Sequence, residues 1–91
     1  MRFYLEPTTG LPHIHGHGVR ETEVIDVLEF SVEDRPGSDG SRLAIGRAST
    51  GRYLRVVYVP DVDGEGMFVV TAYELQGKPL AAFRRRRRRR K

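Results

Sequence analysis

The sequence has no cysteine, no long apolar run and no internal repeat. Without cysteine the chain can form no disulfide and carry out no thiolate chemistry, which fits a reducing compartment. No segment approaches the roughly 18 to 20 apolar residues that a membrane-spanning helix requires. The first ten residues, MRFYLEPTTG, also lack the apolar core of a secretory signal. We therefore expect a cytoplasmic protein that makes no use of a membrane.

Basic charge is concentrated at the C-terminus. Residues 1–83 contain 8 Lys/Arg and 12 Asp/Glu, a balance of −4, whereas residues 84–91 add +8 and bring the chain to +4. A chain of 91 residues buries one modest core, so we expect one domain over residues 1–83. The tail, residues 84–91, should be frayed or disordered because consecutive like charges repel. Its charge predicts a polyanionic partner.

Short periodic segments separated by turn residues predict an α+β domain. Apolar residues at helical spacing predict a helix over residues 20–30, and a loop rich in Gly, Pro, Asp and Ser follows it. Alternating and β-branched residues predict strands at 42–48, 52–59 and 67–75, with a further short strand at 2–5. Short turns favour an antiparallel sheet of three or four strands. One main helix would pack on it and leave the other face partly open, and a short basic helix would follow Pro79.

Three histidines alternate in the segment HIHGHGV, which leads into the helix. In an extended segment His13, His15 and His17 would lie on one side, where imidazoles can bind zinc or nickel. No cysteine and no obvious fourth ligand accompany them, so we expect no metal and no cofactor. Two other interpretations remain open. The segment can be a polar lead-in to the helix, or His17 can act as a general acid or base, because imidazole titrates near neutral pH.

Arginines and tyrosines share the predicted strands. Arginines beside aromatic rings on an open sheet can bind phosphates and stack bases. The same residues can equally form a solvated face. The residues concerned are Arg47, Arg52, Arg55, Tyr53, Tyr58 and Tyr73.

The order of several landmarks resembles the BrnT-type toxins of bacterial toxin–antitoxin pairs. These landmarks are HGV at residues 17–19, a helix, an acidic loop, IGRASTGRYLRVVY at 45–58 and MFVVTAY at 67–73. The resemblance covers about residues 13–83 and implies a small RelE-like fold, cleavage of RNA that halts translation, and a cognate antitoxin. The corresponding toxin strand reads Ser-Ala-Arg, so this chain has Tyr73 in place of an arginine. The segment before HGV is also shorter than in the toxins and lacks their lysine-containing helix.

The leading hypothesis from the sequence is an endoribonuclease that cleaves RNA by metal-independent attack of the 2′-OH. The predicted catalytic residues are His17, Arg52 and Tyr73, with His17 transferring the proton. The predicted RNA-binding residues are Arg47, Tyr53, Arg55, Arg84, Arg85 and Arg86. One alternative is a non-catalytic module that binds RNA or the ribosome through the basic tail. The other is a protein-interaction domain or homodimer.

Overall fold

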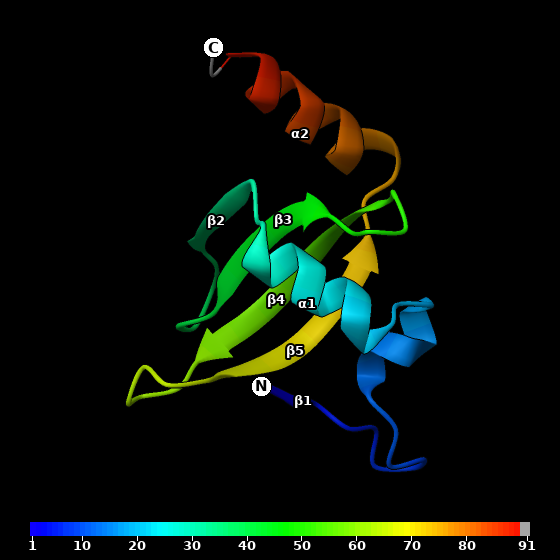
Figure 1. Cartoon of the computed structure of the whole chain (residues 1–91), viewed down its shortest axis with the longest axis vertical. Helices are drawn as coiled ribbons and strands as arrows, with labels where there is room; N and C mark the ends of the chain where they lie inside the picture. The colour runs from blue at the N-terminus through cyan, green and yellow to red at the C-terminus, as the bar shows by residue number, and fades with distance from the viewer. Residues whose placement is uncertain (90–91) are drawn as a thin grey trace.

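The computed structural model describes residues 1–89, which form one five-stranded sheet, one short 3₁₀ helix and two α-helices (Figure 1). The elements in chain order are β1 (Arg2–Phe3), η1 (His13–His17), α1 (Glu21–Glu29), β2 (Glu33–Pro36), β3 (Arg42–Arg47), β4 (Tyr53–Pro60), β5 (Met67–Glu74) and α2 (Gly77–Arg89). The α+β class is therefore confirmed. Neither helix in this described part of the chain is long and apolar enough to cross a membrane.

The sheet is larger than the sequence predicted and is mixed rather than antiparallel. Its strand order is β1-β5-β4-β3-β2, and β1 pairs with β5 in parallel while the other neighbours are antiparallel. The prediction of three or four antiparallel strands was wrong because the start of the predicted loop forms β2. This strand has the sequence EDRP, and charged residues and proline are tolerated where a strand lies at the edge of a sheet.

Helix α1 packs across β3 and β4 on one face of the sheet (Figure 1). Val24 and Val27 of α1 are fully buried against a cluster that includes Leu54 and Val56 of β4. Alternation along β4 therefore places every second residue in this core. Gly46 of β3 allows the close approach, because a Cβ atom there would lie 3.3 Å from the carbonyl oxygen of Phe30 at the end of α1.

The opposite face carries a second, smaller cluster that holds α2. Ile45, Leu75 and Phe83 are almost fully buried together, and Phe83 belongs to α2. Helix α2 begins at Gly77 and continues through Arg89, so the helix extends further into the arginine run than we expected. Its anchoring by Phe83 provides a physical reason, because packing of an apolar side chain supports a short helix that would be marginal alone. Arg90 and Lys91, the end of the predicted tail, lie outside the described residues.

Candidate nucleic-acid interface

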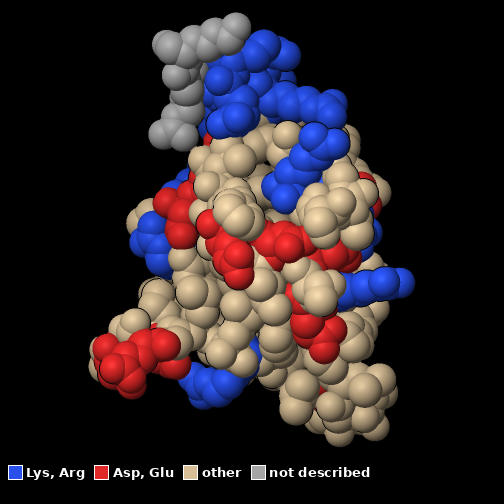
Figure 2. All heavy atoms as spheres, viewed as in Figure 1, with Lys and Arg blue, Asp and Glu red and all other residues tan. Residues whose placement is uncertain are grey.

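Helix α2 presents six consecutive arginines, Arg84 to Arg89, at one end of the molecule. Figure 2 shows basic side chains gathered over this helix, while acidic side chains form a band lower down. Phe83 directly precedes the arginines in α2, and the centre of its ring lies 5.3 Å from the centre of the Tyr53 ring. Two hydrogen bonds from Arg86 to the carboxylate of Glu33, at 2.8 and 3.0 Å, join the next turn to β2. The arginine run is therefore attached to the sheet at two points.

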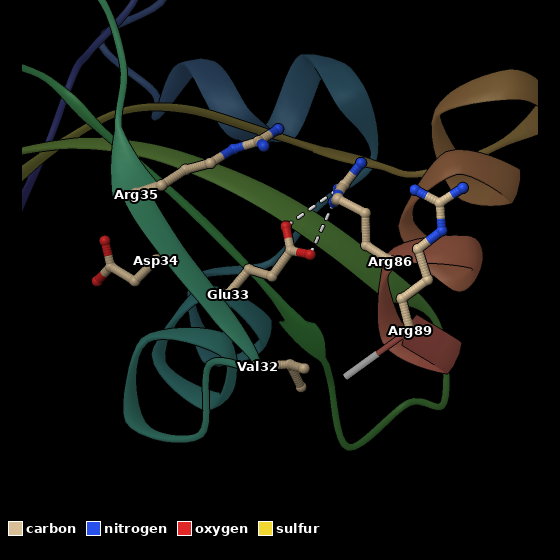
Figure 3. Close-up of a pocket in the computed structure, with 6 residues that line it drawn as sticks. All are labelled: Val32, Glu33, Asp34, Arg35, Arg86 and Arg89. Carbon is tan, nitrogen blue, oxygen red and sulfur yellow. Dashed lines mark hydrogen bonds and ion pairs between the residues drawn. The ribbon is translucent and has the colours of Figure 1, made fainter. Parts of the chain in front are cut away.

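A cleft of about 490 Å³ lies between β2 and α2 (Figure 3). The side chains that line it are Val32, Glu33, Asp34, Arg35, Arg86 and Arg89. Figure 3 shows the guanidinium groups of Arg35 and Arg86 directed toward the same space, with the carboxylate of Glu33 beside Arg86. Asp34 points away and accepts a hydrogen bond of 2.7 Å from Arg42 instead. Three cations and one inward carboxylate thus leave this cleft with an excess of positive charge.

A second cleft, of about 580 Å³, borders α2 at the ends of β4 and β5. Four of the residues that the sequence marked as candidates line it together, namely Arg47, Arg52, Tyr53 and Arg84. Glu74 supplies its acidic group. The Nε–H of Arg47 donates to the carbonyl oxygen of Gly51 at 3.1 Å, which steadies the side chain while leaving its terminal nitrogens for a ligand. The two clefts combine arginines of α2 with arginines of the sheet.

Arg52 is held by acidic residues of the fold rather than presented to solvent. Its guanidinium donates to the carboxylate of Glu23 at 2.7 and 2.9 Å, to Glu74 at 3.3 Å and to the carbonyl oxygen of Gly18 at 2.5 Å. Glu23 is only 3% exposed and also accepts from the hydroxyl of Thr50. This contact network joins α1, η1 and the β3–β4 turn, so the observed partners of Arg52 are structural.

The charge pair at Arg52 and Glu23 is stabilised strongly by its own hydrogen bonds. Donation from Arg52 lowers the pKa of the Glu23 carboxyl from 4.5 to about 2, despite the burial that opposes it. The same bonds raise the pKa of the Arg52 guanidinium above its ordinary value. Both groups therefore stay charged throughout the physiological range. A pair that stays fully charged does not shuttle protons.

The other two predicted catalytic residues, His17 and Tyr73, lie together where η1 contacts β5. The ring of His17 meets the ring of Tyr73 edge-on, with centroids 6.2 Å apart. Tyr73 faces Arg55 across β4 and β5, and the guanidinium of Arg55 lies 5.9 Å from the centre of the Tyr73 ring. Arg55 also donates to the hydroxyl of Tyr73 at 3.3 Å. His17 and Arg55 therefore both contact the ring of Tyr73, and Arg52 bonds the residues next to this group, Gly18 and Glu74.

The histidine segment differs from the extended arrangement on which the three-ligand metal hypothesis depended. Residues 13–17 form the 3₁₀ helix η1, which ends at Gly18 in the left-handed conformation (φ +71°). His15 turns away and bonds Glu21 at 2.6 Å, whereas the Nε2 atoms of His13 and His17 lie 3.2 Å apart. Within residues 1–89 no three side chains of His, Cys, Asp and Glu are arranged so that together they could hold a metal ion. That hypothesis was therefore wrong in its geometry.

Two residues of these sites, Arg35 and Glu23, were not predicted from the sequence. Arg35 lines the cleft of Figure 3, and Glu23 fixes Arg52. The charge of Arg35 was visible, but its placement depended on recognising β2. Glu23 had no clear local signal, because the usual capping box begins with Ser or Thr, whereas Arg20 precedes this helix. In the structure Glu23 accepts a hydrogen bond of 3.1 Å from the backbone N–H of Arg20.

No family model, no curated protein and no solved structure matches this chain.

Proposed function

We propose that this protein binds single-stranded RNA through a surface formed by α2 and the two clefts beside it. The observation that carries the proposal is the shared lining of both clefts by arginines of α2 and arginines of the sheet. Within the described residues, Arg35, Arg47, Arg84 and Arg89 make no ion pair, so their charge is available to a ligand. Guanidinium groups match phosphate oxygens through paired N–H donors.

RNA fits this surface better than an isolated anion does. Cationic groups occur on both sides of α2 and along it, which suits a chain of phosphates more than a single one. Tyr53 lines one of the clefts together with Arg47, Arg52 and Arg84. Aromatic rings next to basic grooves support sequence-tolerant stacking of unpaired bases. The proposal therefore predicts strong dependence on salt and weak dependence on base sequence.

The experiment replaces the six arginines Arg84 to Arg89 with glutamine and measures binding of a fluorescent single-stranded RNA by anisotropy. Loss of up to six phosphate contacts should lower affinity at least about 100-fold at low salt. It should also reduce the slope of log K against log salt by about 4, since each contact contributes about 0.7 on single strands. A variant with lysine at the same six positions is the matched control and should retain most of the slope. Equal binding by the glutamine variant and the wild type would overturn the proposal.

RNA cleavage is a second candidate, favoured by the contacts that His17 and Arg55 each make with Tyr73. In such a reaction the 2′-OH gives up its proton to a base and its oxygen attacks phosphorus, the bond to the 5′-oxygen breaks to leave a 2′,3′-cyclic phosphate, and the leaving 5′-oxygen takes up a proton. His17 is suited to proton transfer and Arg55 to stabilising charge on the phosphorane. The toxin resemblance adds growth arrest on expression and a cognate antitoxin as further expectations of this candidate.

Cleavage is tested separately from binding. Incubation with RNA, followed by analysis for 2′,3′-cyclic phosphate ends, should give products that His17→Ala abolishes. Arg2→Gln, which changes an arginine at the β1 edge, is the control and should leave the products unchanged. RNA that is bound but never cut by the wild type would remove this candidate and leave the binding proposal intact.

A further inference from the structure

The imidazole rings of His13 and His17 face each other on η1. Their Nε2 atoms lie 3.2 Å apart, and their ring planes meet at 78° with centroids 5.0 Å apart. Two imidazole nitrogens bound to one tetrahedral metal, each at about 2.05 Å, are separated by about 3.3 Å. The observed contact is a hydrogen bond between the rings, and its length is within about 0.1 Å of the separation of two ligands on a shared metal. Small rotations of the two rings would direct both lone pairs to one point.

The ring of His13 is also held from its other side, by the carboxylate of Glu6. The Nδ1 atom of His13 is hydrogen-bonded to the carboxylate of Glu6. When Nδ1–H donates to that carboxylate, Nε2 of His13 carries the lone pair and faces His17. A carboxylate behind a metal-binding histidine is the usual outer-shell arrangement, because it sets the tautomer and increases the basicity of the ligand.

The backbone beneath the two rings is also held in place. Ile14, between them in sequence, is 1% exposed and anchors η1 in the main core. The backbone N–H of His13 donates to Tyr4 at 2.8 Å, and Gly18 closes the 3₁₀ helix with a hydrogen bond of 3.0 Å to His15. The two imidazoles are thus presented by a packed segment rather than by a loose loop.

We propose that His13 and His17 bind a divalent transition metal through their Nε2 atoms, with Glu6 as the outer-shell partner of His13. Imidazole ligands favour Cu²⁺, Zn²⁺ and Ni²⁺, and Cu²⁺ binds most tightly in the general order of affinities. No third His, Cys, Asp or Glu joins the pair in residues 1–89, so water or an exogenous donor completes the coordination. The side chain of His13 is 32% exposed, which gives the metal a route from solvent.

The site is independent of the RNA-binding proposal, because none of its residues lines either cleft beside α2. It does share His17 with the cleavage candidate. A metal on Nε2 of His17 would prevent that nitrogen from carrying a proton. Metal binding and metal-independent cleavage at His17 are therefore mutually exclusive in one molecule at one time.

The test titrates the full chain with Zn²⁺ by calorimetry and with Cu²⁺ by its visible absorption. His13→Ala and His17→Ala should each weaken binding at least about tenfold, and Glu6→Gln should weaken it about tenfold, as loss of an outer-shell partner does. His15→Ala is the matched control, since His15 bonds Glu21 and faces elsewhere. It should change the affinity for neither metal.

A measurement on the unmutated chain guards against loss of folding in the variants. Added Zn²⁺ should shift the imidazole proton signals of His13 and His17 at one equivalent and leave those of His15 in place. Equal shifts at all three histidines would overturn the proposal, and so would the absence of binding by the wild type. Unchanged affinity in both His13→Ala and His17→Ala would also overturn it.

Discussion

The arginine on the α1 side of the sheet and the arginines of α2 differ in what surrounds them. Arg52, beside α1, contacts two carboxylates and a carbonyl oxygen. Among Arg84 to Arg89, only Arg86 forms an ion pair within the described residues. The same side-chain chemistry therefore stabilises the fold in one region and remains available to a partner in the other. Chain position alone does not distinguish the two roles, but the carboxylates nearby do.

The distribution of acidic groups reinforces this difference. Glu21, Asp26 and Glu29 belong to α1, and Figure 2 shows a band of acidic side chains across the middle of the molecule, below the basic helix. Without residues 84–91 the chain has four more acidic than basic residues, 12 against 8. A polyanion is therefore repelled from the α1 face and attracted to the α2 end. The overall charge of +4 conceals this polarity.

Glu23→Gln should have the largest effect on stability, because it removes the carboxylate that holds Arg52. A pKa lowered from 4.5 to about 2 corresponds to about 3 kcal/mol of stabilisation at neutral pH. The folded-state pKa is depressed, so this contribution is present above about pH 4.5 and is lost as pH falls toward 2. Urea unfolding of the wild type and the variant should therefore differ by about 3 kcal/mol at pH 7, and the difference should shrink between pH 4.5 and 2.

Glu29→Gln is the control for that prediction, because Glu29 lies at the exposed end of the same helix. It should change the unfolding free energy by less than about 0.5 kcal/mol. RNA binding by folded Glu23→Gln protein should keep its salt slope, since the α2 arginines are untouched. A reduced slope would show that the two regions are not separate in function.

Phe83→Leu should have an intermediate effect, because it weakens the attachment of α2 without removing any charge. Phe83 is 1% exposed and packs with Ile45 and Leu75, so the smaller side chain should cost about 1 kcal/mol. RNA affinity should fall only a few-fold, since all arginines remain but are held less firmly beside the sheet. Calorimetric unfolding and RNA anisotropy measure the two effects on one sample.

A matched change at the far end of the sheet separates attachment from general stability. Val59→Ala alters a half-buried residue of β4 away from α2. It should lower stability without lowering RNA affinity at temperatures where the protein is folded. RNA affinity that falls equally in both variants would mean that binding follows overall stability and not the position of α2.

Local patterns predicted most of the fold, and long-range pairing accounts for the rest. The strand predicted at 52–59 is present as β4, and its alternation places Leu54 and Val56 in the core. Strand β2 was missed because its residues, EDRP, have low strand propensity and pair only as an edge. The parallel pairing of β1 with β5 could not be predicted from local sequence either, since it joins two strands that lie far apart in the chain.

The sequence indicated which kinds of residue belong to the candidate site, but only in part which of them lie together. Arg47, Tyr53 and Arg84 do meet in one cleft. The sequence could not show that Arg52 bonds Glu23, because that contact joins a helix to a strand far along the chain. The pairing of His13 with His17 could not be predicted either, because it depends on the conformation of the segment that carries them. Alternate spacing places residues on one side only in an extended chain, whereas η1 brings positions 13 and 17 together.

The smallest predicted effects compare Arg86 with its neighbour Arg85. Arg86 bonds Glu33, and that bond raises the pKa of the Arg86 guanidinium, whereas Arg85 is exposed and makes no ion pair within the described residues. Arg86→Ala should lower stability by about 0.5 kcal/mol, as expected for a partly exposed pair, and Arg85→Ala should leave it unchanged. Binding should show the reverse. Arg85→Ala should reduce the salt slope by about 0.7, and Arg86→Ala by less, because its charge is partly neutralised by Glu33. Equal slopes for the two variants would show that RNA displaces Glu33, which would place Arg86 among the groups that contact phosphate.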